Sequence, residues 1–188
     1  MKRPGFAVRA LLAALVMTGA SFNAIAQDEL NADQITERIQ AQVERYARSQ
    51  ACAKIAGTDA VLRADMIGAL QPYQLDTTDP AEFVGFWSGD SACAGGTAGT
   101  RLYLVNVKTD EKGNFFVDPQ ASEPAVKLSG INPRFLQRVV GASLDTMTIE
   151  GSDFAAGETG DFPSRTYRYT MKRDASGNWA VTAKKDLG

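Results

Sequence analysis

The sequence predicts an α+β fold in which N-terminal helices pack on a curved antiparallel sheet, or partial barrel, of about six to eight strands. Two observations predict this fold. Apolar residues recur at helical spacing within residues 31–71. Within residues 83–186 the pattern changes to short alternating runs, which are separated by turn sequences rich in glycine, aspartate and asparagine.

The chain begins with a segment that has the plan of a secretory signal peptide. Lys2, Arg3 and Arg9 supply positive charge, and residues 10–20 are apolar. Small residues occupy the two positions that a signal peptidase reads, so we expect cleavage after Ala26. The apolar run is too short to span about 30 Å of hydrocarbon comfortably. We therefore predict a periplasmic or secreted protein with no transmembrane segment in its mature chain.

The mature chain is expected to be a single domain, residues 27–188, after removal of a signal peptide at residues 1–26. The whole chain has a formal net charge of −2, and the predicted signal peptide contains basic but no acidic residues. The mature domain is therefore acidic. Nucleic acids and anionic membranes require a basic surface, so they are poor candidates as partners.

The chain contains no histidine and only two cysteines, Cys52 and Cys93. Imidazole is the usual general base and a common metal ligand, so its absence removes the most frequent routes to catalysis. No other residues stand at metal-ligand spacing, and we expect neither a metal nor a cofactor. These absences favour a binding protein over an enzyme.

Outside the cytoplasm, two distant cysteines most simply form one disulfide bond. A bond between Cys52 and Cys93 would close a loop of about 40 residues and stabilise the fold by roughly 4 kcal/mol on a chain-entropy model. A redox-active pair is the alternative, but such pairs usually have C-x-x-C spacing. We therefore predict a structural bond that ties the end of the first helix to the beginning of the sheet.

We expect the denatured, unreduced protein to contain no free thiol, because both sulfur atoms would be in the bond. Titration with a thiol-reactive reagent before and after reduction measures this directly. Detection of both thiols before reduction would reject the bond.

The first predicted helix begins after Asn31, a favourable N-cap that forms a capping-box pair with Gln34. It is expected to run through Cys52 and to end at Gly57, a residue that favours helix termination. Its apolar stripe consists of Ile35, Ile39, Val43 and Tyr46.

A second, shorter helix is predicted from Thr58 or Asp59 to Gln71, where Pro72 follows. Its apolar residues at helical spacing are Val61, Leu62, Met66 or Ile67, and Leu70.

The remaining elements are predicted strands. Residues 100–108 are apolar on both faces, which is typical of an interior strand, and residues 115–117 return across a turn at 110–114. Further strands are expected near residues 125–128, at 135–140, 146–150 and 165–173, and, after a second turn at 174–178, from residue 179 onward. The alternation predicts that Met147, Ile149, Tyr167, Tyr169, Met171, Trp179, Val181 and Ala183 face inward.

Two short motifs beside Cys93 are candidates for binding. Asp90 stands in a Gly-Asp-Ser sequence that occurs around hydrolase serines, but the chain offers no histidine and no S-x-x-K lysine as a base, so a turn is the simpler interpretation. Gly95 and Gly96 belong to a glycine-rich loop whose backbone N–H groups could hold an anion or form the rim of a site. Arg101, at the start of the next strand, is a further candidate binding residue.

Aromatic residues and one sheet face provide other candidates. Trp87 belongs to an aromatic group that is either core or the lining of a pocket. Arg168 and Lys172 lie on the outer row of their predicted strand, which is either a solvated face or a surface for a partner protein. An exposed edge strand could also receive a partner by adding a strand to the sheet.

Four acidic residues crowd around the predicted loop at 151–163. Calcium binds clusters of carboxylates, but the spacing matches no known calcium loop, and a solvated acidic loop is the simpler interpretation. A pair of acids facing each other across a cleft could instead serve a glycosidase. The four residues are Glu150, Asp153, Glu158 and Asp161.

These observations favour an exported, non-catalytic protein that binds or inhibits another macromolecule, or serves as an accessory factor in the cell envelope. A protein or envelope component is preferred as the partner over a small molecule. The first alternative is a carrier of a small apolar ligand, and the second is a carboxylate-dependent hydrolase of glycan or cell wall. The carrier's pocket would be lined by Trp87, Tyr103, Tyr167, Tyr169 and Trp179.

Overall fold

The computed structural model describes residues 30–50, 61–74, 79–90, 101–159 and 162–188. In this part of the chain the elements are α1 (Ala32–Gln50), β1 (Val61–Gln71), β2 (Glu82–Gly89), β3 (Arg101–Thr109), β4 (Phe115–Val117), the 3-10 helix η1 (Pro119–Ala121), β5 (Leu128–Ser129), the 3-10 helix η2 (Pro133–Phe135), β6 (Leu136–Ser143), β7 (Thr146–Asp153), β8 (Arg165–Arg173) and β9 (Trp179–Asp186). The predicted signal peptide and the predicted Cys52–Cys93 bond lie outside the described residues.

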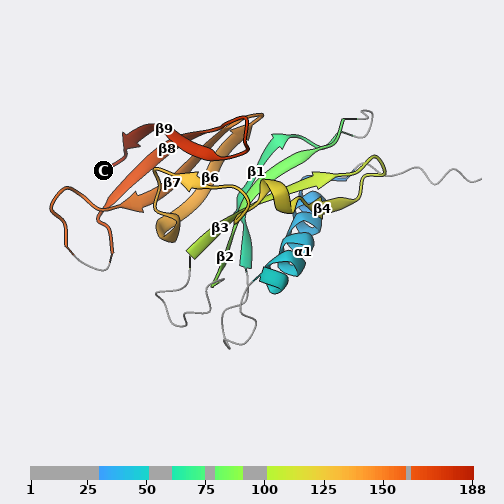
Figure 1. The fold of residues 1–188 in the computed structure, drawn as a ribbon, viewed down its shortest axis with the longest axis horizontal. Helices are drawn as coiled ribbons and strands as arrows, with labels where there is room; N and C mark the ends of the chain where they lie inside the picture. The colour runs from blue at the N-terminus through green and yellow to red at the C-terminus, as the bar shows by residue number, and fades with distance from the viewer. Residues whose placement is uncertain (1–29, 51–60, 75–78, 91–100, 160–161) are drawn as a thin grey trace, which may run out of the picture.

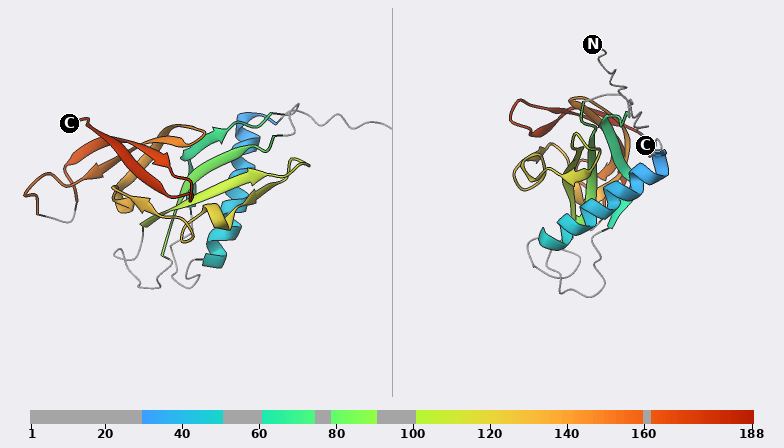
Figure 2. Two further views of the ribbon diagram at one scale, coloured as in Figure 1. Left: turned by 45° about the horizontal axis from the view of Figure 1, so that its top comes forward. Right: turned by 90° about the vertical axis from the view of Figure 1, so that its right-hand side faces the viewer.

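The described strands form two sheets that do not close into a barrel (Figure 1). The first sheet has the order β1-β2-β3-β4 and is antiparallel throughout. The second has the order β5-β9-β8-β7-β6, with β5 parallel to β9 and the other pairs antiparallel. The helix α1 covers the first sheet on the side away from β7, β8 and β9 (Figure 2). The prediction of an α+β fold built mainly on antiparallel sheet is thus confirmed.

The predicted N-terminus of the first helix is confirmed. Asn31 and Gln34 form the reciprocal capping pair, with both N–H to side-chain oxygen distances at 2.9 Å. The helix turns Ile39 and Val43 into the core, where their side chains are at most 2% exposed. Its described part ends at Gln50, so the expected stop at Gly57 lies outside the described residues.

The second predicted helix is wrong, because the residues expected to form it belong to β1. Leu62, Met66 and Leu70 are spaced four residues apart, and this spacing fits one face of a strand as well as one face of a helix. All three are buried. A bulge follows Leu62 in the pairing with β2. Gly68 disfavours a helix interior, and in the strand it allows a close approach of β6.

Most of the predicted strands are confirmed, but the described part of the chain holds nine strands and the prediction gave six to eight. The two strands that the prediction lacked are β1 and β2. The strand expected near residues 125–128 is shorter and later than predicted, because Val126 donates its N–H to the Ser122 carbonyl in a turn (3.2 Å). Of the residues predicted to face inward, the buried ones are Met147, Ile149, Tyr169, Met171 and Trp179; Tyr167 and Val181 are partly buried, and Ala183 is exposed.

Two hairpin turns share one sequence pattern, Asp-x-x-Gly-Asn, and one geometry. In the first, the Asp110 carboxylate accepts the backbone N–H groups of Lys112 and Asn114 at 2.9 and 2.8 Å. In the second, Asp174 accepts those of Ser176 and Asn178 at 2.8 and 2.9 Å. The glycine of each turn has a positive φ, 75° at Gly113 and 86° at Gly177, which glycine adopts without steric cost. Both predicted turns are confirmed.

The two sheets meet along β1 and β6. At Gly68 an added Cβ would lie 2.8 Å from the Ala142 Cβ and 2.9 Å from the Val139 Cγ1, so the two strands approach more closely than any side chain at residue 68 would allow. Leu144 donates its N–H to the Leu70 carbonyl at 2.8 Å. We call this contact between β1 and β6 the seam.

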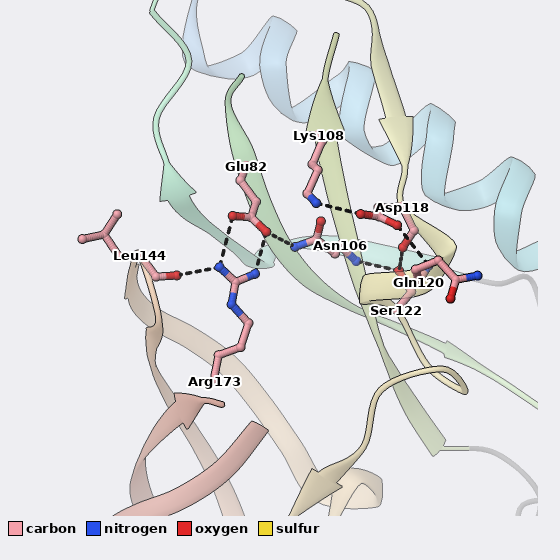
Figure 3. A network of polar contacts seen from close by, with 8 residues as sticks. All are labelled: Glu82, Asn106, Lys108, Asp118, Gln120, Ser122, Leu144 and Arg173. Carbon is pink, nitrogen blue, oxygen red and sulfur yellow. Dashed lines mark hydrogen bonds and ion pairs between the residues drawn. The ribbon is translucent and has the colours of Figure 1, made fainter. Parts of the chain in front are cut away.

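An ion pair between Glu82 and Arg173, which we call the Glu82–Arg173 fork, is a second contact between the sheets (Figure 3). Arg173 of β8 donates two hydrogen bonds to the Glu82 carboxylate of β2, at 2.6 and 3.2 Å, and a third to the Leu144 carbonyl at 3.3 Å. Asn106 donates to the same carboxylate at 2.8 Å. The side chains of Glu82 and Arg173 are only 16% and 24% exposed, so the pair is largely shielded from water. Burial alone would raise the pKa of Glu82, but the hydrogen bonds from Arg173 and Asn106 outweigh it, and this pKa lies below its ordinary value.

We expect Glu82→Gln to lower the free energy of unfolding by about 1–3 kcal/mol at pH 7, because Arg173 loses its charged acceptor. A carboxyl whose pKa is depressed on folding stabilises the native state above its unfolded pKa, about 4.3, and this contribution is lost as the pH falls through its folded pKa. The deficit of the variant should therefore shrink in acid. Urea unfolding at about pH 7 and pH 3 measures it, with Glu111→Gln in an exposed turn as control. An equal deficit at both pH values would contradict the expectation.

The close contact at the seam leads to a second prediction, which concerns substitution of Gly68. Gly68→Ala should destabilise the protein by about 1–3 kcal/mol, because the added methyl group overlaps β6. Gly141→Ala on β6 is the matched control, because an added Cβ there meets no atom within 4 Å, and its effect should stay within about 0.5 kcal/mol. Thermal or urea unfolding compares the two variants, and equal effects would show that the seam tolerates a wider spacing.

Candidate functional site

A cleft of ≈ 310 Å³ opens at one end of the seam, where β1, β2 and β3 meet η2 and β6. Four apolar residues and a serine form part of its wall, and three arginines complete it. The described residues of the wall include no carboxylate. The lining residues are Met66, Phe86, Leu102, Leu136, Ser88, Arg63, Arg101 and Arg134. We call this the arginine cleft.

Arg63 reaches across the seam. Its guanidinium donates two hydrogen bonds to Asp65, at 2.9 and 2.7 Å, and one to the Gln137 carbonyl of β6 at 2.6 Å. The side-chain hydrogen bond with Asp65 raises the pKa of Arg63, and the same bond lowers the pKa of Asp65. Arg63 is therefore a fixed cation with its own counterion.

Arg101 is held by an aromatic ring and a buried carboxylate. Its Cζ lies 4.2 Å from the centroid of the Tyr103 ring, and its Nη2 lies 3.1 Å from the Glu123 Oε1. The other Glu123 oxygen accepts the Leu104 N–H at 2.8 Å. Glu123 is only 7% exposed, so its carboxylate is fixed against β3 and fixes Arg101 in turn.

The polar network in Figure 3 explains why Glu123 stands where it does. Asp118 caps η1 by accepting the Gln120 N–H at 3.0 Å, and it binds Lys108 of β3 at 2.7 Å. Ser122 accepts the Asn106 N–H at 2.9 Å. These bonds hold residues 118–122 alongside β3. The next residue, Glu123, is thereby placed within hydrogen-bond distance of Leu104 and Arg101.

Arg134 differs from the other two arginines. It occupies the middle of η2, whose N-cap Asn132 accepts the Arg134 N–H at 3.1 Å. Its Cζ lies 5.5 Å from the Phe135 ring centroid. Within the described part of the chain, Arg134 forms no ion pair with an acidic side chain. It gives the cleft a positive charge that no described carboxylate offsets.

The arrangement is suited to holding an anion attached to an apolar group. Guanidinium groups bind carboxylates through paired, charge-assisted hydrogen bonds, and small-molecule sites typically combine an apolar wall with a few polar groups. Arginine does not deprotonate in proteins and so offers no general base. Among the described residues of the wall, Ser88 has the one nucleophilic group, a hydroxyl.

The structure brings one of the predicted site residues, Arg101, to the cleft. Trp87 lies in the core, 1% exposed, with its ring stacked on Tyr103 at a centroid distance of 4.8 Å. Asp90 is buried at the end of β2. Arg168 and Lys172 lie on the outer face of β8, away from the cleft wall. Gly95 and Gly96 lie outside the described residues.

The aromatic residues predicted to line a carrier pocket are mainly core residues. Trp87, Tyr169 and Trp179 are each 1% exposed and Tyr103 is 6% exposed, while Tyr167 is partly buried. The aromatic residue in the wall of the cleft is Phe86.

The described acidic residues predicted to gather at one loop each bind different partners. Glu150 and Asp153 belong to β7, where Glu150 accepts hydrogen bonds from Arg138 (2.7 Å) and Arg168 (2.6 Å). Lys184 lies 2.8 Å from Asp153, and Glu158 accepts backbone N–H groups of its own loop. Among the described residues no group of three or more potential metal ligands gathers. Asp161 lies outside the described residues.

Eight of the described carboxyl groups have a pKa that favours the charged form. Each one whose pKa departs clearly from its ordinary value departs downward; for Glu150 the largest cause is the hydrogen bond from Arg138. A glycosidase general acid needs the opposite, a raised pKa. The groups with lowered pKa are Asp65, Glu82, Asp110, Asp118, Glu150, Asp153, Glu158 and Asp174.

Sequence reasoning missed Arg63 and Arg134. Arg63 fell within the wrongly predicted second helix, and Arg134 follows an Asn-Pro pair that caps a 3-10 turn. That Asn-Pro-Arg sequence is a usable signal for the turn, but it gives no indication that β1 lies nearby.

Comparison of the chain with protein-family models, with curated proteins and with solved structures gave no match. The described helices include none with the length and apolar character needed to cross a lipid bilayer.

Proposed function

We propose that this chain is an exported, non-catalytic binding protein, and that the arginine cleft holds a carboxylate attached to an apolar group. The observation that carries the proposal is the cleft wall itself, whose described residues combine three guanidinium groups with four apolar side chains and include no carboxylate. Arg63 and Arg101 are immobilised by Asp65 and Glu123, so little side-chain freedom is lost when a ligand arrives. Arg134 supplies the charge without a described counterion.

Two kinds of ligand present this chemistry outside the cytoplasm: the C-terminal carboxylate of a protein or peptide, and a small amphiphilic acid. The first continues the sequence-based expectation of a macromolecular partner, and the second continues the alternative of a small-ligand carrier. Both would place the carboxylate at Arg134 and the apolar group against Phe86 and Leu136.

The test is calorimetric titration of the mature protein with four probes: octanoate, octanol, a short leucine-rich peptide with a free C-terminus, and the same peptide with an amidated C-terminus. The charged probes should bind, and octanol and the amidated peptide should bind at least about tenfold more weakly, because a hydrogen bond to a charged group contributes about 1.5–3 kcal/mol. Tighter binding of the free peptide than of octanoate identifies a protein partner, and the reverse identifies a small ligand.

Variants locate the binding site. Arg134→Gln should weaken binding of the charged probe about tenfold. Arg165→Gln, which removes a surface arginine paired with Asp186 at 3.2 Å, should leave binding unchanged. Binding of octanol equal to that of octanoate, an unchanged affinity in Arg134→Gln, or no binding of either charged probe would overturn the proposal.

A further inference from the structure

Part of one edge of the strand β9 pairs with no described strand. On one side it pairs with β8 along its whole length, and on the other side it pairs with β5 only at Trp179 and Ala180. Gly130, which follows β5, lies against Val181, where an added Cβ would be 3.0 Å from the Val181 Cβ. From Thr182 onward no described strand pairs with this side of β9, and Figure 1 shows β9 at the margin of the second sheet. We call residues 182–186 the β9 edge.

The β9 edge is exposed along its whole length. A row of unpaired backbone N–H and C=O groups is a template for another strand. A bulge in the pairing with β8 places Thr182 between the two registers, where its hydroxyl bonds to the Thr170 carbonyl at 3.2 Å. Beyond it, residues 183–186 pair regularly with β8, so the outward backbone groups of this stretch are regularly spaced.

The charge of the β9 edge is positive. Lys185 is the register partner of Arg168, which in turn faces Glu150 and then Arg138 across β7 and β6. This row contains three cations and one carboxylate, and that carboxylate is already bonded to both arginines. Like charges directly opposite each other on a sheet are destabilising, and Lys185 forms no ion pair with any described acidic side chain. An acidic residue beside Lys185 would relieve this repulsion.

The same charges disfavour a second copy of this chain as the occupant. Two β9 edges paired antiparallel would bring Lys184 and Lys185 of one copy close to those of the other. The two acidic residues near these lysines already form ion pairs within the chain. Asp186 of β9 lies 3.2 Å from Arg165, and Asp153 of β7 lies 2.8 Å from Lys184.

We propose that the β9 edge receives an extended acidic segment of a partner protein as an additional strand of the second sheet. Backbone hydrogen bonds supply the affinity of such strand addition, and side-chain complementarity supplies the specificity. Here the specificity comes from an acidic residue placed beside Lys185. This interaction surface is independent of the arginine cleft.

The test titrates the mature protein with an acetylated and amidated peptide of about eight residues in which glutamate alternates with valine. Two matched peptides serve as comparisons: one has lysine in place of glutamate, and the other keeps the glutamates but carries N-methyl groups on alternate amides. The acidic peptide should bind and should slow amide hydrogen exchange at residues 182–186. The lysine peptide should not bind, and N-methylation should weaken binding at least about tenfold, because the methylated amides cannot donate.

Lys185→Glu should weaken binding of the acidic peptide about fivefold or more, whereas Lys112→Glu, in the turn between β3 and β4, should not. If the N-methylated peptide bound as tightly as the unmethylated acidic peptide, charge attraction alone would explain the binding. That result would overturn the proposal of strand addition. A concentration-dependent dimer that the acidic peptide disrupts would identify a second copy as the occupant and overturn the proposal, as would failure of the acidic peptide to bind. Arg134→Gln should leave binding of the acidic peptide unchanged. Failure of the β9-edge proposal can therefore be distinguished from failure of the arginine-cleft proposal.

Discussion

The close approach of β1 to β6 at Gly68 is the constraint on which the molecule depends. Two sheets of ordinary length would otherwise be separate layers, each with one uncovered apolar face. Because residue 68 has no side chain, β6 comes within contact distance of β1, and the Leu144 N–H reaches the Leu70 carbonyl. The arginine cleft exists only at this junction, since its wall takes residues from both sheets.

The Glu82–Arg173 fork complements the seam by a different kind of force. At the seam the side chains of Val139 and Ala142 fit against the backbone at Gly68, whereas the Glu82–Arg173 contact is a shielded ion pair. Replacing a buried ion pair by apolar residues is often neutral for stability, so such a pair is better understood as specifying one arrangement than as the main source of stability. In this molecule it holds β8 against β2 and, through the Leu144 carbonyl, against the end of β6.

Local patterns predicted much of this fold, and long-range contacts explain what they missed. The alternation at Met147 and Ile149 identified β7 because these two side chains are buried, whereas Thr146 and Thr148 between and beside them are only partly buried. The stripe of Leu62, Met66 and Leu70 misled because a four-residue spacing satisfies both helical and strand geometry. Of the cleft, only Arg101 was predicted as a binding residue, and its position beside the other two arginines could not be predicted. The three arginines are separated by more than thirty residues each, and only the docking of the sheets brings them together.

The repeated Asp-x-x-Gly-Asn turn has a consequence for how the chain reaches this structure. One copy closes the hairpin of β3 and β4 in the first sheet, and the other closes that of β8 and β9 in the second. Each sheet therefore possesses its own contact of short sequence separation, for which loop closure costs little entropy. The junction between the sheets joins segments far apart in the chain and has no such local start. We therefore expect each sheet to form from its own hairpin before the two sheets join, and the arginine cleft to form only when they join.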